Sequence, residues 1–381
     1  MNTDTLVIGA GIVGLAVAER LSRGGRPVVV LERHGSALQE TSSRNSQVIH
    51  AGLYYPADSW KARLCVPGNG SLHSWCEVHG VPHRRVGKLV VATSDDELPE
   101  LEQRLAQGKA NGVPGLELVG PDFVRAKEPE VRATAALWVP SSGIVDVHAF
   151  ADSLAAEAKA HGATFAFRHR VVGLQRLGGR WVLALEGPDG AAVELGARLV
   201  VNAAGLESDA VAALAGIDVD AAGYRLHYVK GHYFRLKAQG RLRHLVYPVP
   251  AAHLAGLGVH VTIGLDGEVK LGPDVLDLPD RRVDYSVPEA LCARFVAAAQ
   301  RFLPWVTEAL VEPDQAGIRP KLSRPGEPFR DFVIAEESAR ALPGLVNLIG
   351  IESPGLTCAL EIARVVAGLA DPVVAGRRGD R

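Results

Sequence analysis

Two of the thirteen histidines stand inside apolar segments with the character of strands, His50 in "NSQVIHAGLYYP" and His260 in "LGVHVT". Histidine exchanges its proton near neutral pH, so each could be a general base that takes a proton from a substrate. The same pattern also suits a histidine whose hydrogen bonds are satisfied inside a core. Tyr54 and Tyr55, which follow His50, are either hydroxyl and stacking contacts at the entrance of a site or ordinary packing.

A positive charge suited to holding a carboxylate is Arg319 in "AGIRPK". Its guanidinium is a planar fork that binds a carboxylate through two parallel hydrogen bonds. It also lies shortly before the last buried strand of the chain. The competing interpretation is a surface arginine. Lys321, two residues further on, is either its neighbour in a site or a solvated side chain.

A glycine turn near the N-terminus has the spacing of a dinucleotide site. Gly9, Gly11 and Gly14 form GxGxxG directly after an apolar strand and at the start of a helical pattern. The first glycine allows the tight turn, the second lets a pyrophosphate approach the backbone, and the third lets helix and strand pack closely. Glu32 ends the next strand, 18 residues after Gly14 (32 − 14), where a carboxylate would bind ribose hydroxyls.

The elements that must position these residues are of several kinds. Residues 4–33 have the pattern strand, turn, helix, strand, which is one βαβ unit with the valine-rich strands of a parallel sheet. Residues 149–163 predict a helix, and residues 164–195 a β-meander of short strands joined by Gly-Gly and Pro-Asp-Gly turns. Residues 197–205 add a buried strand, and residues 345–370 a strand, a Pro-Gly turn and a helix.

This layout favours FAD over a nicotinamide nucleotide. One N-terminal glycine motif, a β-meander and a strand ending in "NAAG" are typical of FAD-binding folds, and no second GxGxxG is present. The turn "GIESPGLT" opens a helix whose N-terminus would favour the negative charge of a reduced flavin.

The domain prediction follows from two segments that interrupt the parallel α/β pattern of the chain. Parallel α/β pieces alternate with mainly antiparallel pieces, which indicates two interleaved domains. The predicted fold class is α/β, with a Rossmann-type, glutathione-reductase-like FAD-binding domain and a discontinuous, mainly antiparallel β-sheet substrate domain. We assign residues 1–85, 145–222 and 316–381 to the first domain and residues 86–144 and 223–315 to the second.

Composition excludes several classes of function. The 41 lysines and arginines nearly balance the 43 acidic residues, so no global basic field calls for nucleic acid. The four cysteines are far apart in the sequence, without CxxC or zinc spacing, so no metal is predicted. The N-terminus lacks the pattern of a signal peptide, and no apolar stretch is long enough for a transmembrane segment. We therefore expect a cytoplasmic protein, with peripheral attachment to a membrane left open.

The chain resembles the L-2-hydroxyglutarate dehydrogenase/oxidase family, within the FAD-dependent glycine oxidase/D-amino-acid oxidase superfamily. The resemblance runs nearly end to end, through "GAGIVGLAVA", "NSQVIHAGLYYP", "GKLVVATS", "VPSSGIVD", "VKGHYFRL", "LVYPVP", "LGVHVT", "LGPD", "AGIRPKL" and "NLIGIESPGLTCAL". It implies a non-covalent FAD enzyme that oxidises the 2-hydroxyl of a short dicarboxylate by hydride transfer to flavin N5. Electrons would then leave to oxygen, a quinone or a carrier, and the sequence does not identify which.

The resemblance also implies roles for individual residues. Arg319 would bind a substrate carboxylate, and either His50 or His260 would be the base. Independently of the resemblance, Lys230 lies mid-strand before a glycine in "HYVKGHYF" and could reach the distal carboxylate of such a substrate. Gly52 would let the chain pass close to the cofactor. The predicted cofactor-binding residues are Gly9, Gly11, Ile12, Val13, Gly14, Glu32, Arg33, Ser42, Ser43, Asn45, Ser46, Val172, Ala204, Gly205, Gly350, Ser353, Pro354, Gly355, Leu356 and Thr357.

Three alternatives keep the same fold. An amino-acid oxidase would need less positive charge at the far end of the pocket, so Lys230, His260 and Lys321 argue against it. A silent FAD-binding protein would have no need to retain His50, His260 and Arg319. A glycerol-3-phosphate dehydrogenase would want more arginine and lysine than these segments contain.

Overall fold

The computed structural model describes residues 2–249 and 258–375. Its centre is a six-stranded sheet in the order β20–β21–β13–β1–β2–β9, parallel except for the pair β20–β21. The strands are β1 (Thr5–Ile8), β2 (Val28–Glu32), β9 (Thr164–Phe167), β13 (Leu199–Asn202), β20 (Val333–Glu336) and β21 (Leu345–Ile349). Every residue of β1, β13 and β21 is buried, as parallel strands covered on both faces require.

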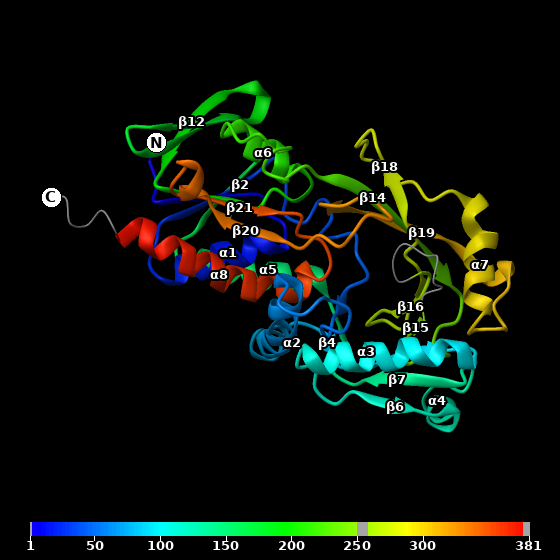
Figure 1. The fold of residues 1–381 in the computed structure, drawn as a ribbon. Coiled ribbons are helices and arrows are strands. Elements are labelled where there is room, and N and C mark those ends of the chain that lie inside the picture. The colour runs from blue at the N-terminus through cyan, green and yellow to red at the C-terminus, as the bar shows by residue number, and fades with distance from the viewer. Residues whose placement is uncertain (1, 250–257, 376–381) are drawn as a thin grey trace.

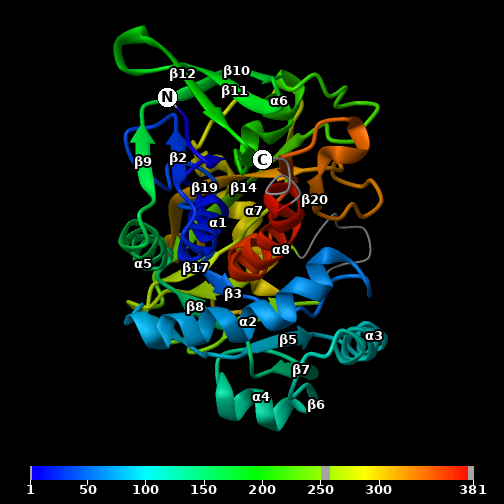
Figure 2. The ribbon, with the colours of Figure 1, turned by 90° about the vertical axis from the view of Figure 1, so that its left-hand side faces the viewer.

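Alternate residues of these strands enter two different cores. Val7 and Val201 pack with the helices on one face, whereas Leu6 and Val200 pack on the opposite face. The first face is covered by α1 (Ile12–Arg23), α5 (Val147–Ala160) and α8 (Gly355–Ala375). The second is covered by α6 (Ser208–Leu214) and by the antiparallel sheet of β10 (Arg170–Leu177), β11 (Arg180–Glu186) and β12 (Ala192–Ala197). Figures 1 and 2 show these layers, with β10–β12 at one end of the molecule.

The β-meander is shorter than the sequence predicted. Its expected first strand, β9, instead pairs in parallel with β2 at the edge of the central sheet. The chain turns out of β9 at Arg168, whose φ of +59° lies in the left-handed region, before β10 begins. The residues "TFAF" could form a strand in either sheet. Because β9 follows helix α5, the chain can return to the central sheet and place β9 parallel to β2.

A second, nine-stranded sheet carries the mainly antiparallel part. Its path is β18–β14–β17–β16–β15–β5–β7–β6, with β19 paired to the other side of β14; the pair β5–β15 is parallel. The strands are β5 (Lys88–Ala92), β6 (Glu117–Val119), β7 (Ala135–Val139), β14 (His227–Leu236), β15 (Leu245–Pro248), β16 (Val261–Ile263), β17 (Val269–Leu271), β18 (Leu276–Leu278) and β19 (Val311–Lys321).

Strand β19 joins the two halves of the molecule. It crosses the predicted domain limit at residues 315/316 and lies against the segment that follows β2. The hydroxyl of Thr41 donates to the carbonyl of Ile318 at 3.0 Å, and Gln315 Nε2 donates to the carbonyl of Asn45 at 3.2 Å. A Cβ on Gly317 would lie 2.1 Å from the carbonyl oxygen of Arg44, so glycine is needed for this approach.

The helix α2 (Trp60–His79) was not predicted. It contains Pro67 and Gly68, which disfavour a helix in isolation. Tertiary packing outweighs this propensity, because Gly68 lets α2 approach the start of α8, where a Cβ would lie 2.5 Å from the carbonyl oxygen of Thr357. Ser59 caps its N-terminus by accepting from the N–H of Ala62.

The remaining elements are short. A small antiparallel sheet contains β3 (Val48–Ile49), β4 (His83–Arg84) and β8 (Gly143–Val145). The other helices are α3 (Leu98–Ala110), α4 (Pro121–Lys127) and α7 (Cys292–Gln300), with 3₁₀ turns at Asp95–Glu97, Pro188–Gly190, Gly205–Glu207, Glu289–Leu291, Glu308–Leu310 and Glu337–Arg340. None of the helices in the described residues is both long and apolar enough to cross a bilayer.

Candidate active site

The predicted glycine turn lies between β1 and α1. Gly9 has a φ of +104°, and a Cβ there would lie 2.5 Å from the carbonyl oxygen of Ala203. A Cβ on Gly14 would lie 2.0 Å from the carbonyl oxygen of Gly9. Glycine is therefore required at both positions, at Gly9 for the turn and at Gly14 for the close approach of helix and strand.

The start of α1 is fixed by two side chains. Gly11 is its N-cap residue and lines the ligand space, which places the N-terminus of the helix at that space. The N–H of Ala10 donates to Glu32 Oε2 at 2.8 Å, and the N–H of Ile12 donates to Ser42 Oγ at 3.0 Å. Glu32 therefore stabilises the turn while it also lines the cavity in which a ribose was predicted.

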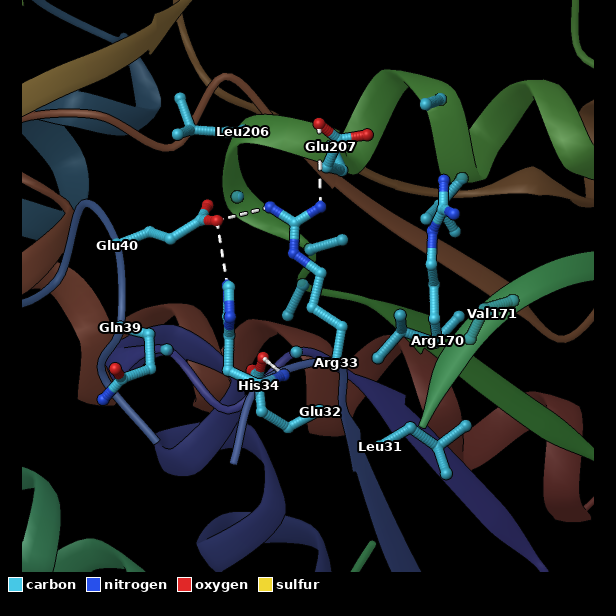
Figure 3. Close-up of a pocket in the computed structure, with 18 of the residues that line it drawn as sticks. Leu31, Glu32, Arg33, His34, Gln39, Glu40, Arg170, Val171, Leu206 and Glu207 are labelled. Carbon is cyan, nitrogen blue, oxygen red and sulfur yellow. Dashed lines mark hydrogen bonds and ion pairs between the residues drawn. The ribbon is translucent and has the colours of Figure 1, made fainter. Parts of the chain in front are cut away.

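A cavity of about 310 Å³ begins at this turn and runs past the end of β2. Figure 3 shows Arg33 and His34 on one side of it, both directed at the carboxylate of Glu40. Arg33 also lies 3.8 Å from a carboxylate oxygen of Glu207, and His34 lies 3.0 Å from Glu40. These contacts form a polar, partly acidic end suited to the hydroxyl groups of a ribose.

A second cavity of about 420 Å³ continues from the first and lies between the two large sheets. Both cavities are lined by Gly11, Thr41, Ser42, Ala203 and Gly205, so they form one extended space. The predicted cofactor residues that line this space are Gly9, Gly11, Ile12, Val13, Glu32, Arg33, Ser42, Asn45, Ser46, Val172, Ala204, Gly205, Ser353, Pro354, Gly355 and Leu356.

The two histidines singled out in the sequence meet in the second cavity, with His50 directly after β3 and His260 directly before β16. Burial, together with the nearby ammonium group of Lys88, holds the pKa of His50 well below its usual 6.5. Burial also lowers the pKa of His260 to about 3. Both rings are therefore neutral at pH 7 and able to accept a proton.

The surroundings of the two rings differ. His260 Nδ1 lies 2.9 Å from the carbonyl oxygen of Gly258, which can only accept, so Nδ1 carries the proton and Nε2 keeps its lone pair. The His260 ring stacks on Tyr247 with centroids 3.8 Å apart. His50 Nε2 lies 3.2 Å from the hydroxyl of Ser353, and the His50 N–H donates to Thr357 Oγ1 at 3.0 Å.

Arg319 lines the same cavity from β19. Its Nη2 donates to the carbonyls of Asp274 at 2.8 Å and Lys230 at 3.4 Å, and its Nε donates to that of Val229 at 3.4 Å. Carbonyls orient the guanidinium without neutralising it. Among the residues that the structure describes, no carboxylate forms an ion pair with Arg319, so its charge is available to an anion in the cavity.

The prediction for Lys230 has to be corrected. Gly231 and Tyr233 on β14 line the cavity, and Lys230 does not. Successive residues of a strand point to opposite faces, so Lys230 points away and its Nζ pairs with Asp284 at 2.8 Å. The side chain of Lys230 is buried there and does not reach a ligand in this space.

Comparison with known proteins shows what this arrangement belongs to. The family described as "FAD dependent oxidoreductase" matches residues 4–369. The mitochondrial L-2-hydroxyglutarate dehydrogenase of Arabidopsis thaliana is 40% identical, over 96% of this chain and 83% of that protein. The human protein of the same name is 30% identical, over 96% of this chain and 88% of that protein. The chain belongs to the L-2-hydroxyglutarate dehydrogenase family of FAD-dependent oxidoreductases.

Solved structures show the fold of this family. The FAD-bound L-alpha-glycerophosphate oxidase of Mycoplasma pneumoniae superposes with a TM-score of 0.86 at 25% identity, covering 97% of this chain and 95% of that one. Glycine oxidase from Geobacillus kaustophilus superposes with a TM-score of 0.76 at 19% identity, with the same coverage. The resemblance read from the sequence and the predicted fold class are both confirmed.

The residues of this FAD-dependent oxidoreductase fit its cofactor. The extended space runs from the acidic end of β2, past the start of α1, to the start of α8. Ser353, Pro354, Gly355 and Leu356 line it at α8, where the N-terminus of a 21-residue helix favours negative charge. These groups would hold the flavin ring, and the turn at Gly11 would hold the pyrophosphate.

Four predicted cofactor residues support the site without lining it. Gly14 packs against the turn, as described above. The hydroxyl of Ser43 donates to the carbonyl of Glu40 at 3.0 Å. Gly350 has a φ of +71° and packs against Leu322. Thr357 is fully buried and accepts the N–H of His50. Their contribution is to position neighbouring residues.

Lys321, considered in the sequence analysis as a neighbour of Arg319, belongs to a charged cluster in the same cavity whose other members, Lys61 and Glu352, were not predicted. Lys61 on α2 donates to Glu352 at 2.8 Å, and Lys321 on β19 donates to the same oxygen at 2.6 Å. Although burial alone raises it, the two lysines lower the pKa of Glu352 to about 2. Lys61 and Glu352 are 291 residues apart, so only the fold brings them together.

Two tyrosine positions are now placed. Tyr54 and Tyr55 both line the second cavity, together with Tyr233 and Tyr247, which the sequence analysis did not single out. Burial raises the pKa values of Tyr54 and Tyr247 above the usual 10, so both hydroxyls are protonated donors at pH 7. No local pattern marks Tyr247, because all four residues of β15 are buried and their sequence does not alternate.

Proposed function

We propose that this chain oxidises the 2-hydroxyl of L-2-hydroxyglutarate and releases 2-oxoglutarate. The observation that carries the proposal is the position of Arg319, a cation without a carboxylate partner among the described residues, in one cavity with His50 and His260. A carboxylate clamp beside a neutral base is what oxidation of a 2-hydroxy acid needs. The names of the relatives at 40% and 30% identity support the same substrate.

The roles of the side chains follow from their chemistry. Arg319 binds the C1 carboxylate and so fixes C2 at one place in the cavity. One of the two histidines takes the hydroxyl proton. Bound FAD supplies the acceptor for the hydride that leaves C2, so the substrate loses two electrons and two hydrogens in total. Apolar lining residues such as Ile351 and Leu356 exclude water around the reacting atoms.

The two histidines differ in how free their Nε2 atom is to accept the proton. His260 has a fixed tautomer with a free Nε2, whereas His50 shares its Nε2 with the hydroxyl of Ser353. His50→Gln and His260→Gln separate the two roles, since the variant that keeps its rate of flavin reduction has not lost the base.

The decisive experiment is anaerobic mixing of the purified yellow protein with L-2-hydroxyglutarate. We expect the flavin band to bleach, and D-2-hydroxyglutarate, glycine and D-alanine not to bleach it at the same rate. A yellow protein that is bleached by an amino acid and not by L-2-hydroxyglutarate would replace this proposal with an amino-acid oxidase. A protein that cannot be reconstituted with FAD would refute the proposal altogether.

Glycerol 3-phosphate is the second candidate substrate. The overall likeness to the Mycoplasma pneumoniae oxidase favours it, and Lys61 and Lys321 add cations to the cavity. Both lysines share the charge of Glu352, however, which leaves less for a phosphate. The same anaerobic assay with glycerol 3-phosphate decides between the two substrates.

The electron acceptor and the cytoplasmic location stay predictions. Reoxidation of the reduced protein with oxygen or a quinone tests the first, and cell fractionation tests the second.

A further inference from the structure

Lys88 is a buried cation that the mechanism above does not use. It begins β5, is 1% exposed, and is surrounded by buried residues along the whole strand. Lysine is almost never fully buried without a partner. In the described part of the chain, no carboxylate lies within ion-pair distance of its ammonium group. Burial lowers the pKa of Lys88 to about 8, so the group remains mostly cationic at pH 7.

The contacts of the ammonium group are two aromatic rings that line the cavity. It lies 4.2 Å from the ring centre of Tyr247 and 5.5 Å from that of Tyr54. The hydroxyl groups of both tyrosines are buried and have no hydrogen-bond partner among the residues that the structure describes. Unpaired buried hydroxyls are costly, so two of them beside one buried cation indicate a place prepared for an anion.

This group lies close to His260, as Arg319 does. Tyr247 stacks on the ring of His260, and both Lys88 and Arg319 act to lower the pKa of His260. Two cations, Lys88 and Arg319, therefore lie near one candidate base. The proposed substrate has two carboxylates to be neutralised, one on C1 beside the hydroxyl of C2 and a second two methylene groups further on.

We propose that Tyr54, Tyr247 and Lys88 form the subsite for the second carboxylate of the substrate. The two hydroxyls donate hydrogen bonds to it, and the ammonium behind them supplies the compensating charge. The inference rests on the proposed function and replaces the role that the sequence had suggested for Lys230. It makes Lys88 a determinant of specificity for dicarboxylates.

The test compares two substrates that differ only at this end. L-2-hydroxyglutarate and L-2-hydroxyvalerate have the same chain length, and only the first has the second carboxylate. Anaerobic flavin reduction is measured for the wild type, Lys88→Met, Tyr54→Phe/Tyr247→Phe, and Lys127→Met. The last variant is the matched control, because it removes a lysine that packs over Phe123 and Trp138 outside the cavity.

The preference is the ratio of the second-order rate constants of flavin reduction by L-2-hydroxyglutarate and by L-2-hydroxyvalerate. We expect Lys88→Met to lower this ratio by about 100-fold, because the second carboxylate would be buried without a cation beside it. The double tyrosine variant should lower it by about 10-fold, and Lys127→Met should leave it unchanged. The tyrosine variants remove hydroxyls that have no internal partner, so they should fold and bind FAD even if Lys88→Met does not. An unchanged preference in the FAD-loaded tyrosine variant, or in folded Lys88→Met, overturns the subsite.

Binding of glutarate separates this inference from the proposed function. Glutarate has both carboxylates and no oxidisable hydroxyl, and its binding is followed by the shift of the flavin spectrum. Wild type that binds glutarate through Lys88 and yet is not reduced by L-2-hydroxyglutarate would keep the subsite and refute the proposed reaction. Wild type that is reduced by L-2-hydroxyglutarate, with glutarate binding equal in wild type and Lys88→Met, would keep the reaction and refute the subsite.

Discussion

Replacement of Glu352 by Gln tests whether a buried carboxylate is needed between two lysines of the cavity. The side chains of Lys61 and Glu352 are 5% and 8% exposed, so the charge of Lys61 would remain buried without its partner. The fall in the pKa of Glu352 from 4.5 to about 2 corresponds to about 3 kcal/mol of folding stability at pH 7. Measured losses on breaking buried pairs, about 3–5 kcal/mol, agree with this figure.

The assay is thermal unfolding of the FAD-saturated protein at several pH values. For a chain of this length, a loss of about 3 kcal/mol lowers Tm by about 4 °C. The pKa of Glu352 is lower in the folded than in the unfolded state, so its contribution is complete above about pH 4.5 and is lost as the pH falls towards 2. The difference in the free energy of unfolding between wild type and Glu352→Gln should therefore stay constant from pH 8 to pH 5. It should narrow to about 2 kcal/mol at pH 3.5.

Glu312→Gln is the matched control. Glu312 also bridges two cations, Arg235 at 2.7 Å and Lys237 at 3.0 Å, but these side chains are exposed at the surface. Solvent screens such pairs, so Tm should change little. Equal shifts in the two variants, or a gap for Glu352→Gln that does not depend on pH below 4.5, would refute the reasoning from burial.

Three further outcomes follow from the site. Gly14→Ala would place a Cβ 2.0 Å from a backbone oxygen, so the purified protein should contain less than about a tenth of the wild-type FAD; Gly70→Ala, with open space around it, should contain the normal amount. Arg319→Ala should raise KM for L-2-hydroxyglutarate by about 100-fold while the flavin stays bound, and an unchanged KM would contradict its role as a clamp. Because the pKa values of His50 and His260 lie below 6.5 and the base acts when deprotonated, kcat/KM should stay level as the pH falls from 7 to 6; a half-loss at pH 6.5 would contradict this.

The parts of the fold that the sequence predicted are those with local causes. The glycine turn, β2 and α8 each depend on patterns within about twenty residues, and the structure contains all of them. Helix α2 was missed because Pro67 and Gly68 are poor helix formers, and the reason that they are tolerated lies in α8, nearly three hundred residues away. Strand β9 was placed in the wrong sheet because its pattern does not distinguish between partners.

The candidate site divides in the same way. His50, His260 and Arg319 could be named from residue type and neighbours, although only the fold shows that they meet. Residue type and neighbours do not distinguish Lys230 from Lys88, because both are lysines on strands. The sequence predicted the first as a site residue and did not predict the second. Which face of a strand enters a cavity depends on pairing with other strands, and a shift of one residue reverses the answer.

The contact between β19 and the segment after β2 limits how this enzyme can be recombined. A designer who wished to change its specificity would graft the nine-stranded sheet of a relative onto this nucleotide-binding core. Gly317 leaves no room for a side chain against the backbone of Arg44, and Arg319 follows two residues later on the same strand. A chimaera would therefore have to exchange residues 41–46 together with β19, because the residues for specificity and for cofactor binding lie on the two sides of this contact.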